Sequence, residues 1–222
     1  KAQIFKKYGL DFCCGGKKTV RQICLEKGLD PIVIEKELQQ IVQGGNATST
    51  HNFNEWNPDF LADYIVNIHH SYVRKYLPEI MGYAIKVAQV HGDRHNELRE
   101  IKELVEEVRD EMMEHMVDEE NILFPMVKEI VNAKKLNIQL SFGKNKFSEI
   151  VMNTEEEHDH VGRAMEKIRA LSDNYSIPSD ACTSYKLLYK MLEEFENDLF
   201  THIHLENNIL FPKAIEIEKT LP

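Results

Sequence analysis

The chain contains the segment HMVDEENILFP, which begins at His115, and the segment HIHLENNILFP, which begins at His202. Seven of the eleven aligned positions are identical. In each copy a histidine precedes a glutamate by four residues, as His115 precedes Glu119 and His202 precedes Glu206. Residues four apart share one face of an α-helix, with Cβ atoms about 5–6 Å apart. Two helices that each offer an imidazole and a carboxylate to one interior point predict a metal site.

Apolar periodicity predicts an all-α protein whose larger part is an up-down four-helix bundle. The four expected helices run from about 59 to 90, 95 to 133, 146 to 171 and 179 to 217. Short connections between long helices favour this topology, in which the second and fourth helices are parallel. The two copies of the segment fall on these helices, so their side chains can meet in the middle. Pro78 predicts a bend in the first helix.

The residues before the bundle indicate a small helical unit and a linker. Thr19 is placed to cap a helix that ends at Gly28, and Asp30 followed by Pro31 opens another. The run GGNATST from Gly44 is typical of a flexible linker. The predicted division is a helical domain with two adjacent cysteines over 1–43, a linker over 44–57 and the bundle over 58–222.

A bundle interior also needs ligands from the first and third helices. On the third helix, His158 shares a stripe with apolar residues and is expected to face the core, whereas His160 is expected to face outward. On the first helix, His69 and His70 both lie on apolar stripes, so periodicity leaves the choice between them open. Two further histidines, His91 and His95, lie near a helix end. Histidines at such positions cap helices or lie on the surface more often than they bind a metal, and we expect the same of these two.

The expected donor set is rich in nitrogen and contains carboxylates but no thiolate. Four histidines and two glutamates of this kind suit iron in a binuclear site. Ferritin-like bundles use Glu-x-x-His spacing with mostly carboxylate ligands, whereas this chain has His-x-x-x-Glu and additional histidines, which indicates the hemerythrin type. Zinc is the second choice of metal, but six converging ligands exceed the four that zinc usually takes.

Each copy of the segment ends in a proline within a helical pattern, at Pro125 and Pro212. A proline ring collides with the carbonyl four residues earlier, here that of Asn121 or Asn208. We therefore expect a bend or a broken turn just past the metal ligands, or simply the end of the helix.

Two neighbouring cysteines, Cys13 and Cys14, lie in a glycine-rich turn before a helix. Adjacent cysteines do not readily form a disulfide with each other, and the helix dipole favours thiolate, so both are candidates for redox or thiol chemistry. They could bind a soft metal, form mixed disulfides or contact a client protein, or simply fill a tight turn. Cys24 and Cys182 are interpreted as structural.

Composition restricts the function classes. The formal net charge of -10 argues against nucleic acid as a partner, because phosphate binding needs clustered positive charge. No apolar run is long enough to cross a membrane. Four cysteines in 222 residues do not form a disulfide framework and favour a cytoplasmic setting. No signal peptide is visible, although the chain begins at Lys1 without a methionine, so upstream residues are expected to be missing.

Taken together, these motifs resemble the repair-of-iron-centres family, the iron–sulfur cluster repair di-iron proteins. The resemblance covers nearly the whole chain. It rests on YGLDFCCGGK from Tyr8, LPE from Leu77, VH at 90–91, the two histidine–glutamate segments, EHD at 157–159 and ACT at 181–183.

The resemblance also implies which residues hold the metal. In the family the ligand on the first helix precedes the LPE triplet by seven residues, which selects His70 and leaves His69 as the alternative. The implied ligand set is His70, His115, Glu119, His158, His202 and Glu206. The two glutamates are expected to bridge two iron ions in an oxo-bridged, carboxylate-bridged centre.

The function implied by the resemblance is repair of iron–sulfur clusters damaged by nitric oxide or oxidants, through donation of iron. The expected partners are iron–sulfur proteins with damaged clusters and the gases nitric oxide and oxygen, and a homodimer is one option for assembly. One alternative is an enzyme that reduces nitric oxide at the two irons. Another is a hemerythrin-type carrier or sensor of oxygen or nitric oxide, which would not need the module that contains Cys13 and Cys14.

Overall fold

The computed structural model describes residues 4, 8, 19–43, 52–143 and 145–222, and every regular element in these ranges is helical. Cys13 and Cys14 lie outside the described residues, so the predictions made for them stay predictions.

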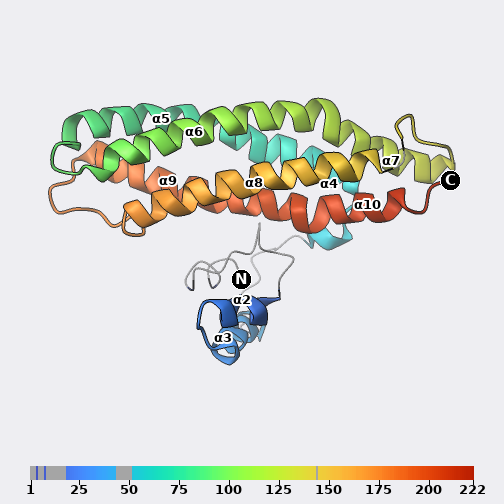
Figure 1. Ribbon diagram of the computed structural model, residues 1–222, viewed down its shortest axis with the longest axis horizontal. Coiled ribbons are helices and arrows are strands. Elements are labelled where there is room, and N and C mark those ends of the chain that lie inside the picture. Colours follow the sequence, from blue (N-terminus) through green and yellow to red (C-terminus); the bar gives the residue numbers. More distant parts are fainter. Residues whose placement is uncertain (1–3, 5–7, 9–18, 44–51, 144) are drawn as a thin grey trace.

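Four long helical rods form the bundle (Figure 1). We call them bundle helices 1 to 4. Bundle helix 1 consists of α4 (Pro58–Ile65), η2 (Val66–His70) and α5 (Ser71–His91). Bundle helix 2 consists of α6 (Glu97–Asp118), η3 (Glu119–Leu123) and α7 (Phe124–Leu136). Bundle helix 3 is α8 (Lys146–Leu171), and bundle helix 4 consists of α9 (Thr183–Leu205), η4 (Glu206–Leu210) and α10 (Phe211–Glu218).

The contacts between these helices give a square arrangement. Helices α5 and α8 each contact both α6 and α9, which places α6 and α9 at opposite corners of the bundle. The duplicated segment therefore occurs on two helices that face each other across the interior. This geometry directs both copies toward the bundle axis.

Three of the four bundle helices contain one turn of π-helix, in η2, η3 and η4. In η3 and η4 the π turn starts at the glutamate of the repeated segment and ends just before Phe-Pro. The N–H of Phe124 bonds to the carbonyl of Glu119, five residues back, and Phe211 bonds in the same way to Glu206. This wider turn relieves the collision that a proline ring makes in an α-helix. The expected bend or broken turn is thus replaced by a π turn, and the helix continues beyond it.

Pro78 lies within α5, which continues without interruption from Ser71 to His91. No second element begins at this proline.

The hydrophobic core of the bundle has two parts on either side of the histidine–glutamate residues. One part, the α5–α9 block, is formed mainly by α5, α6, α8 and α9 and includes Leu77, Val108 and Phe195. The other, the α7–α10 block, is formed mainly by α4, α7, α10 and the start of α8 and includes Phe147 and Phe211. The polar residues between them are buried, so their placement must be supported by specific contacts.

The segment 52–57, which was expected to belong to the linker, contains the short 3-10 helix η1 (Phe53–Glu55). The rings of Phe53 and Trp56 lie 4.7 Å apart, and both contact Tyr64 of α4, with centroid distances of 5.4 and 5.2 Å. This aromatic cluster fixes the entry of the chain into the bundle.

The N-terminal unit contains α2 (Val20–Glu26) and α3 (Pro31–Gln43) in its described part. Thr19 caps α2 as predicted, because its Oγ1 accepts a hydrogen bond from the backbone N–H of Gln22. Gly28 follows with a φ of 67°, a conformation that favours glycine. Asp30 Oδ1 accepts from the N–H of Ile32 and so caps α3.

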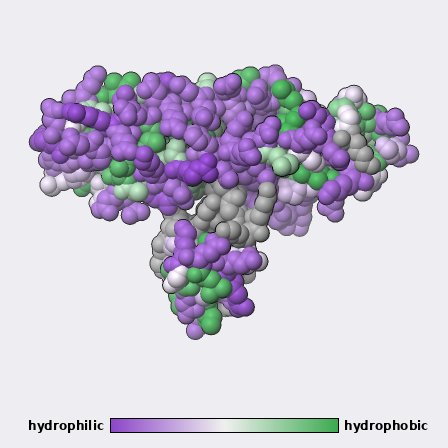
Figure 2. Space-filling view, viewed as in Figure 1, coloured by the Kyte–Doolittle hydropathy of each residue, from purple (hydrophilic) through white to green (hydrophobic). Residues whose placement is uncertain are grey.

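The face of the bundle in Figure 2 is mainly hydrophilic, with scattered hydrophobic residues. Among the residues that the structure describes, none of the helices combines the length and apolar character needed to span a membrane.

Candidate metal centre

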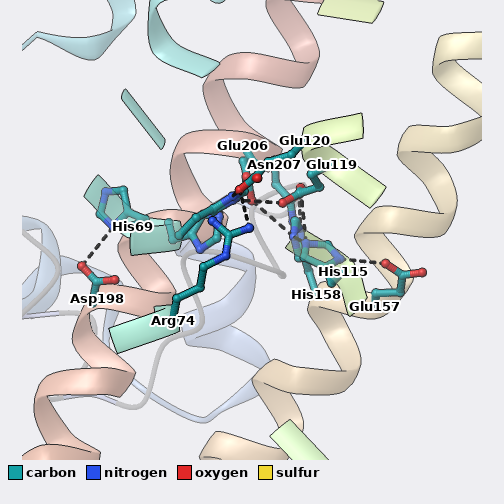
Figure 3. A network of polar contacts seen from close by, with 12 residues as sticks. His69, Arg74, His115, Glu119, Glu120, Glu157, His158, Asp198, Glu206 and Asn207 are labelled. Carbon is teal, nitrogen blue, oxygen red and sulfur yellow. Dashed lines mark hydrogen bonds and ion pairs between the residues drawn. The ribbon is translucent and has the colours of Figure 1, made fainter. Parts of the chain in front are cut away.

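Six buried side chains from all four bundle helices bring their nitrogen and oxygen atoms together between the two halves of the core (Figure 3). They form two overlapping groups, and within each group the ligand atoms lie within 4.8 Å of one another. The first subsite is formed by His70, Glu119, His202 and Glu206. The second subsite is formed by His115, Glu119, His158 and Glu206. Both glutamates belong to both subsites.

Each glutamate directs one carboxylate oxygen to each subsite. Glu119 Oε2 lies 3.2 Å from Nε2 of His70, and its Oε1 lies 3.3 Å from Nε2 of His115. This is the arrangement of a carboxylate that bridges two cations.

Glu206 repeats this arrangement from the opposite corner of the bundle. Its Oε1 lies 3.0 Å from Nε2 of His202, and its Oε2 lies 3.3 Å from Nε2 of His158. The two copies of the duplicated segment therefore place two equivalent carboxylates between the subsites.

The atoms in the interior match a metal better than they match one another. Nε2 of His115 and Nε2 of His158 lie only 2.9 Å apart, and at most one proton can stand between two such nitrogens. Two nitrogens bound at right angles to one ion, with bonds of about 2.1 Å, are about 3 Å apart. Within the described part of the chain, Nε2 of His70 and both carboxylate oxygens of Glu119 are buried without a hydrogen bond. Burial of so many unsatisfied polar atoms is costly unless a cation binds them.

The residue after each bridging glutamate orients the single histidine of another bundle helix. Glu120 Oε1 lies 2.7 Å from Nδ1 of His70, and Asn207 Oδ1 accepts a hydrogen bond of 2.8 Å from Nδ1 of His158. A hydrogen bond at Nδ1 fixes the ring and leaves Nε2 for the metal. The repeat thus supplies both the bridging carboxylates and two of the groups that orient the imidazoles.

The two remaining histidines of the centre, His115 and His202, differ in the surroundings of their Nδ1 atoms. Nδ1 of His115 lies 2.7 Å from Oε2 of Glu157, which immediately precedes His158 in the chain. Nδ1 of His202 is buried and has no hydrogen-bond partner among the described residues. The two subsites are consequently alike in their inner atoms and different in their surroundings.

Electrostatics divides the histidines of the metal-free site into two kinds. Burial opposes protonation of His115, but the nearby carboxylates of Glu119, Glu157 and Glu206 together outweigh it and raise the pKa of His115 well above the usual value. The pKa of His70 is also raised, because contact with Glu119 outweighs burial. Burial alone would raise the pKa of Glu119, but the charge of His115 holds it well below the usual value.

The pKa values of the other histidine of each subsite and of the second glutamate shift in the opposite direction. Burial and the charge of His115 lower the pKa of His158 to about 3. Burial and the charge of His70 lower the pKa of His202 well below its usual value. Burial and the charge of Glu119 raise the pKa of Glu206. Each subsite therefore has one imidazole that holds a proton readily and one that stays neutral.

His69 is buried but does not belong to either subsite. Its Nδ1 lies 3.0 Å from Oδ1 of Asp198, and its ring stacks on His202 with centroids 5.6 Å apart. Figure 3 shows the pair of His69 and Asp198 to one side of the converging residues. Of the two adjacent histidines, only His70 reaches into the centre.

His160, which was expected to face outward, is half-exposed, and its Nε2 lies 2.7 Å from Oε1 of Glu107 on α6. His91 was expected to cap a helix or lie on the surface. The surface interpretation is wrong, because His91 is only 4% exposed.

A cavity of about 370 Å³ borders the second subsite at His115. The other residues that line it are all acidic: Asp110, Glu111, Glu114, Asp118 and Glu157. None of these acidic residues, nor the orienting Glu120 and Asn207, was predicted from the sequence to belong to the site. The sequence does contain a sign of Glu120 and Asn207, because these two residues occupy equivalent positions in the repeat, directly after Glu119 and Glu206.

The fold and these side chains define a class of protein, a helical bundle that can bind cations through histidine and glutamate. The family described as Hemerythrin HHE cation binding domain matches residues 62–214, and a family described as a domain of unknown function, DUF542, matches residues 1–42. The chain therefore belongs to the hemerythrin HHE family, and along its whole length to the family of iron–sulfur cluster repair proteins.

The relatives that show this membership match the chain almost end to end. The iron–sulfur cluster repair protein YtfE of Enterobacter sp. (strain 638) is 36% identical over 215 residues, which cover 96% of this chain and 90% of the relative. The probable iron–sulfur cluster repair protein of Haemophilus influenzae is 36% identical over 217 residues, with the same two coverages. YtfE of Escherichia coli O81 (strain ED1a) is 35% identical over 215 residues, again with these coverages.

Proposed function

We propose that this chain binds two iron ions, bridged by Glu119, Glu206 and an oxo group, and that it repairs iron–sulfur clusters by donating iron. The observation that carries this proposal is the placement of one oxygen of each glutamate in each subsite. The similarity to proteins named iron–sulfur cluster repair proteins supports the type of function. The clusters in question are those damaged by nitric oxide or oxidants.

The protein would give each ion two imidazole nitrogens and two shared carboxylate oxygens. A pair of iron ions held in this way supplies redox chemistry with coordination positions left for a small ligand. Glu120, Asn207 and Glu157 keep the Nε2 atoms of three imidazoles directed inward. The apolar blocks on both sides exclude bulk water from the carboxylates.

The second subsite is the better candidate for the source of donated iron. His115 belongs both to this subsite and to the lining of the acidic cavity, so a cation that leaves its Nε2 encounters carboxylates. The raised pKa of His115 means that its Nε2 takes up a proton readily once the ion has left. His158, whose pKa is about 3, stays neutral and ready to bind again.

Cys13 and Cys14 remain candidates for contact with the damaged client, as the sequence predicts. Two iron–sulfur cluster repair proteins align with 96% of this chain, which includes most of residues 1–42 as well as the bundle, so we propose that both parts serve one repair reaction.

Transfer of labelled iron tests the proposal directly. The chain is loaded with ⁵⁷Fe and mixed with a protein whose [4Fe–4S] cluster has lost iron after exposure to nitric oxide. We expect two ⁵⁷Fe per chain before mixing, a Mössbauer signal of a coupled pair, and label in the rebuilt cluster afterwards. Retention of all label on the chain in both its oxidised and its reduced state refutes donation.

Two variants make this experiment specific. Glu119→Ala removes a carboxylate shared by both subsites and is expected to abolish the iron pair and the transfer. His160→Ala is the matched control, because His160 lies on the same helix as His158 but on the exposed side. Equal transfer by the two variants would show that the label travels as loosely bound iron.

A further inference from the structure

A cysteine and a buried histidine meet at the end of the bundle where α5 stops and α9 begins. Cys182 is the N-cap residue of α9 and is exposed, and its Sγ lies 3.2 Å from Nε2 of His91. His91 is the last residue of α5 and is 4% exposed. Its other nitrogen, Nδ1, is buried without a hydrogen-bond partner among the described residues. A histidine kept only for structure would be expected to have both nitrogens satisfied, whereas this ring is directed at the thiol.

A second imidazole, that of His95, pairs with the neighbouring acidic residues. Nε2 of His95 lies 3.0 Å from Oδ1 of Asp180, and its Nδ1 lies 3.2 Å from Oε1 of Glu97. The contact with Asp180 raises the pKa of His95. Arg94 also pairs with Asp180, at 3.2 Å. The carboxylate two residues before Cys182 is therefore neutralised by two cationic groups.

The start of α9 favours negative charge at the same point. This helix is 23 residues long and has no acidic residue in its first turn. The side chain of Cys182 makes no capping hydrogen bond, so it does not use the free N–H groups of that turn in the resting state. The positive end of the helix dipole stabilises an anionic sulfur beside it.

We propose that Cys182 and His91 form a reactive thiol site that exchanges with low-molecular-weight disulfides. His91 Nε2 accepts the proton of Cys182, and the sulfur attacks one sulfur of the disulfide. The new S–S bond joins Cys182 to half of the disulfide, the old S–S bond breaks, and the departing thiolate takes the proton from His91. A thiol and a disulfide are consumed, and a mixed disulfide and a thiol are produced, so no other oxidant is required.

This site is separate from the proposed iron centre. Cys182 precedes His202 by 20 residues along α9, which corresponds to about 30 Å at 1.5 Å per residue. The same helix thus carries a metal ligand near one end and the thiol at the other. Modification of Cys182 should therefore proceed equally in metal-free and iron-loaded protein.

Peptide-resolved mass spectrometry of the full chain tests the proposal. Glutathione disulfide is the probe, reactions are stopped with acid, and trypsin places the cysteines on three separate peptides, 8–17, 22–27 and 170–186. A synthetic peptide of residues 170–186 gives the rate of the same thiol without the fold. Cys24, which is buried and whose pKa is raised by burial, is the internal negative control.

We expect Cys182 in the folded chain to react on the order of tenfold faster than in the peptide, with Cys24 unmodified. His91→Gln should remove this acceleration while circular dichroism shows an intact bundle, and iron loading should leave the rate unchanged. A native rate equal to that of the peptide overturns the proposal, and this comparison decides the question even if the variant does not fold. A folded His91→Gln chain that reacts at the native rate overturns it as well.

Discussion

Replacement of Asn207 by leucine tests how far the centre depends on a residue that is not among the proposed metal ligands. Asn207 Oδ1 accepts a 2.8 Å hydrogen bond from Nδ1 of His158, which is 1% exposed. Leucine leaves that buried N–H without a partner, which costs about 1–3 kcal/mol of stability in the metal-free chain. The ring also loses its fixed tautomer, and the loss of such a partner lowers metal affinity by about 10- to 100-fold. That change corresponds to about 1.4–2.7 kcal/mol of binding free energy.

The two effects are measured separately. Urea unfolding of the metal-free protein gives the change in stability, and anaerobic titration with iron(II) against a competing chelator gives the change in affinity. Asn207→Asp is the first control, because a carboxylate still accepts the hydrogen bond. Asn208→Leu is the second, because Asn208 lies in the same π turn and contacts Nδ1 of His204, which is not one of the six converging residues.

We expect only Asn207→Leu to lose affinity. Wild-type affinity in this variant would refute the argument that Asn207 fixes His158. Equal losses in the leucine and aspartate variants would show that the hydrogen-bond acceptor is not the cause.

Three further outcomes follow from the structure. His70→Ala should lower the metal content per chain, whereas His69→Phe should retain two ions, as measured by elemental analysis; the reverse result would exchange the roles of the two residues. Protons compete with metal for His115, because the pKa of this residue is raised, so iron binding should weaken as pH falls from 8 to 6. Binding should also release more protons at the lower pH, and calorimetry in buffers of different ionisation enthalpy measures this number. pH-independent binding would contradict this reasoning. Arg169→Met removes the 2.8 Å ion pair of the fully buried Glu196 and should lower the free energy of unfolding by about 3–5 kcal/mol, and an unchanged denaturation midpoint would contradict it.

The sequence was most informative where structure is local. A spacing of four residues on a helix is enough to put a histidine and a glutamate side by side, so the repeat led to four of the six side chains that meet in the centre. The choice between His69 and His70 was different. Both are buried, and both belong to the π turn η2, where the 3.6-residue period on which the stripes depend does not hold.

Contacts between distant parts of the chain could not be predicted in the same way. The hydrogen bond from His158 to Asn207 depends on how α8 lies against η4. The contact of His91 with Cys182 depends on two helix ends that are far apart in sequence. Cys182 was interpreted as structural, and the exposure of this residue and its contact with His91 are the observations on which the proposed thiol site depends.

The backbone around the proline of the repeated segment also differs from the conformation expected from the sequence. A proline four residues after Asn121 excludes a regular α-turn, which the sequence analysis interpreted as a bend or a break. The chain instead widens into a π turn and continues as a helix, and that turn begins at the bridging Glu119. The same sequence feature therefore shapes the backbone at the residue that faces both subsites.

The division of the core by the histidine–glutamate residues has a consequence for how the bundle unfolds. The α5–α9 block and the α7–α10 block are each apolar, and the polar layer between them includes buried atoms without a hydrogen bond, among them Nε2 of His70 and both carboxylate oxygens of Glu119. In the metal-free chain the two blocks should act as separate cooperative units, with amide hydrogens on either side exchanging at different rates. If iron binds in the centre as proposed, its ligands come from all four bundle helices, so it would couple the two blocks and a loaded chain should unfold in one transition. The proposed donation of iron would then leave a protein that is less tightly coupled at its middle, which a calorimetric scan before and after transfer would record as a broader transition.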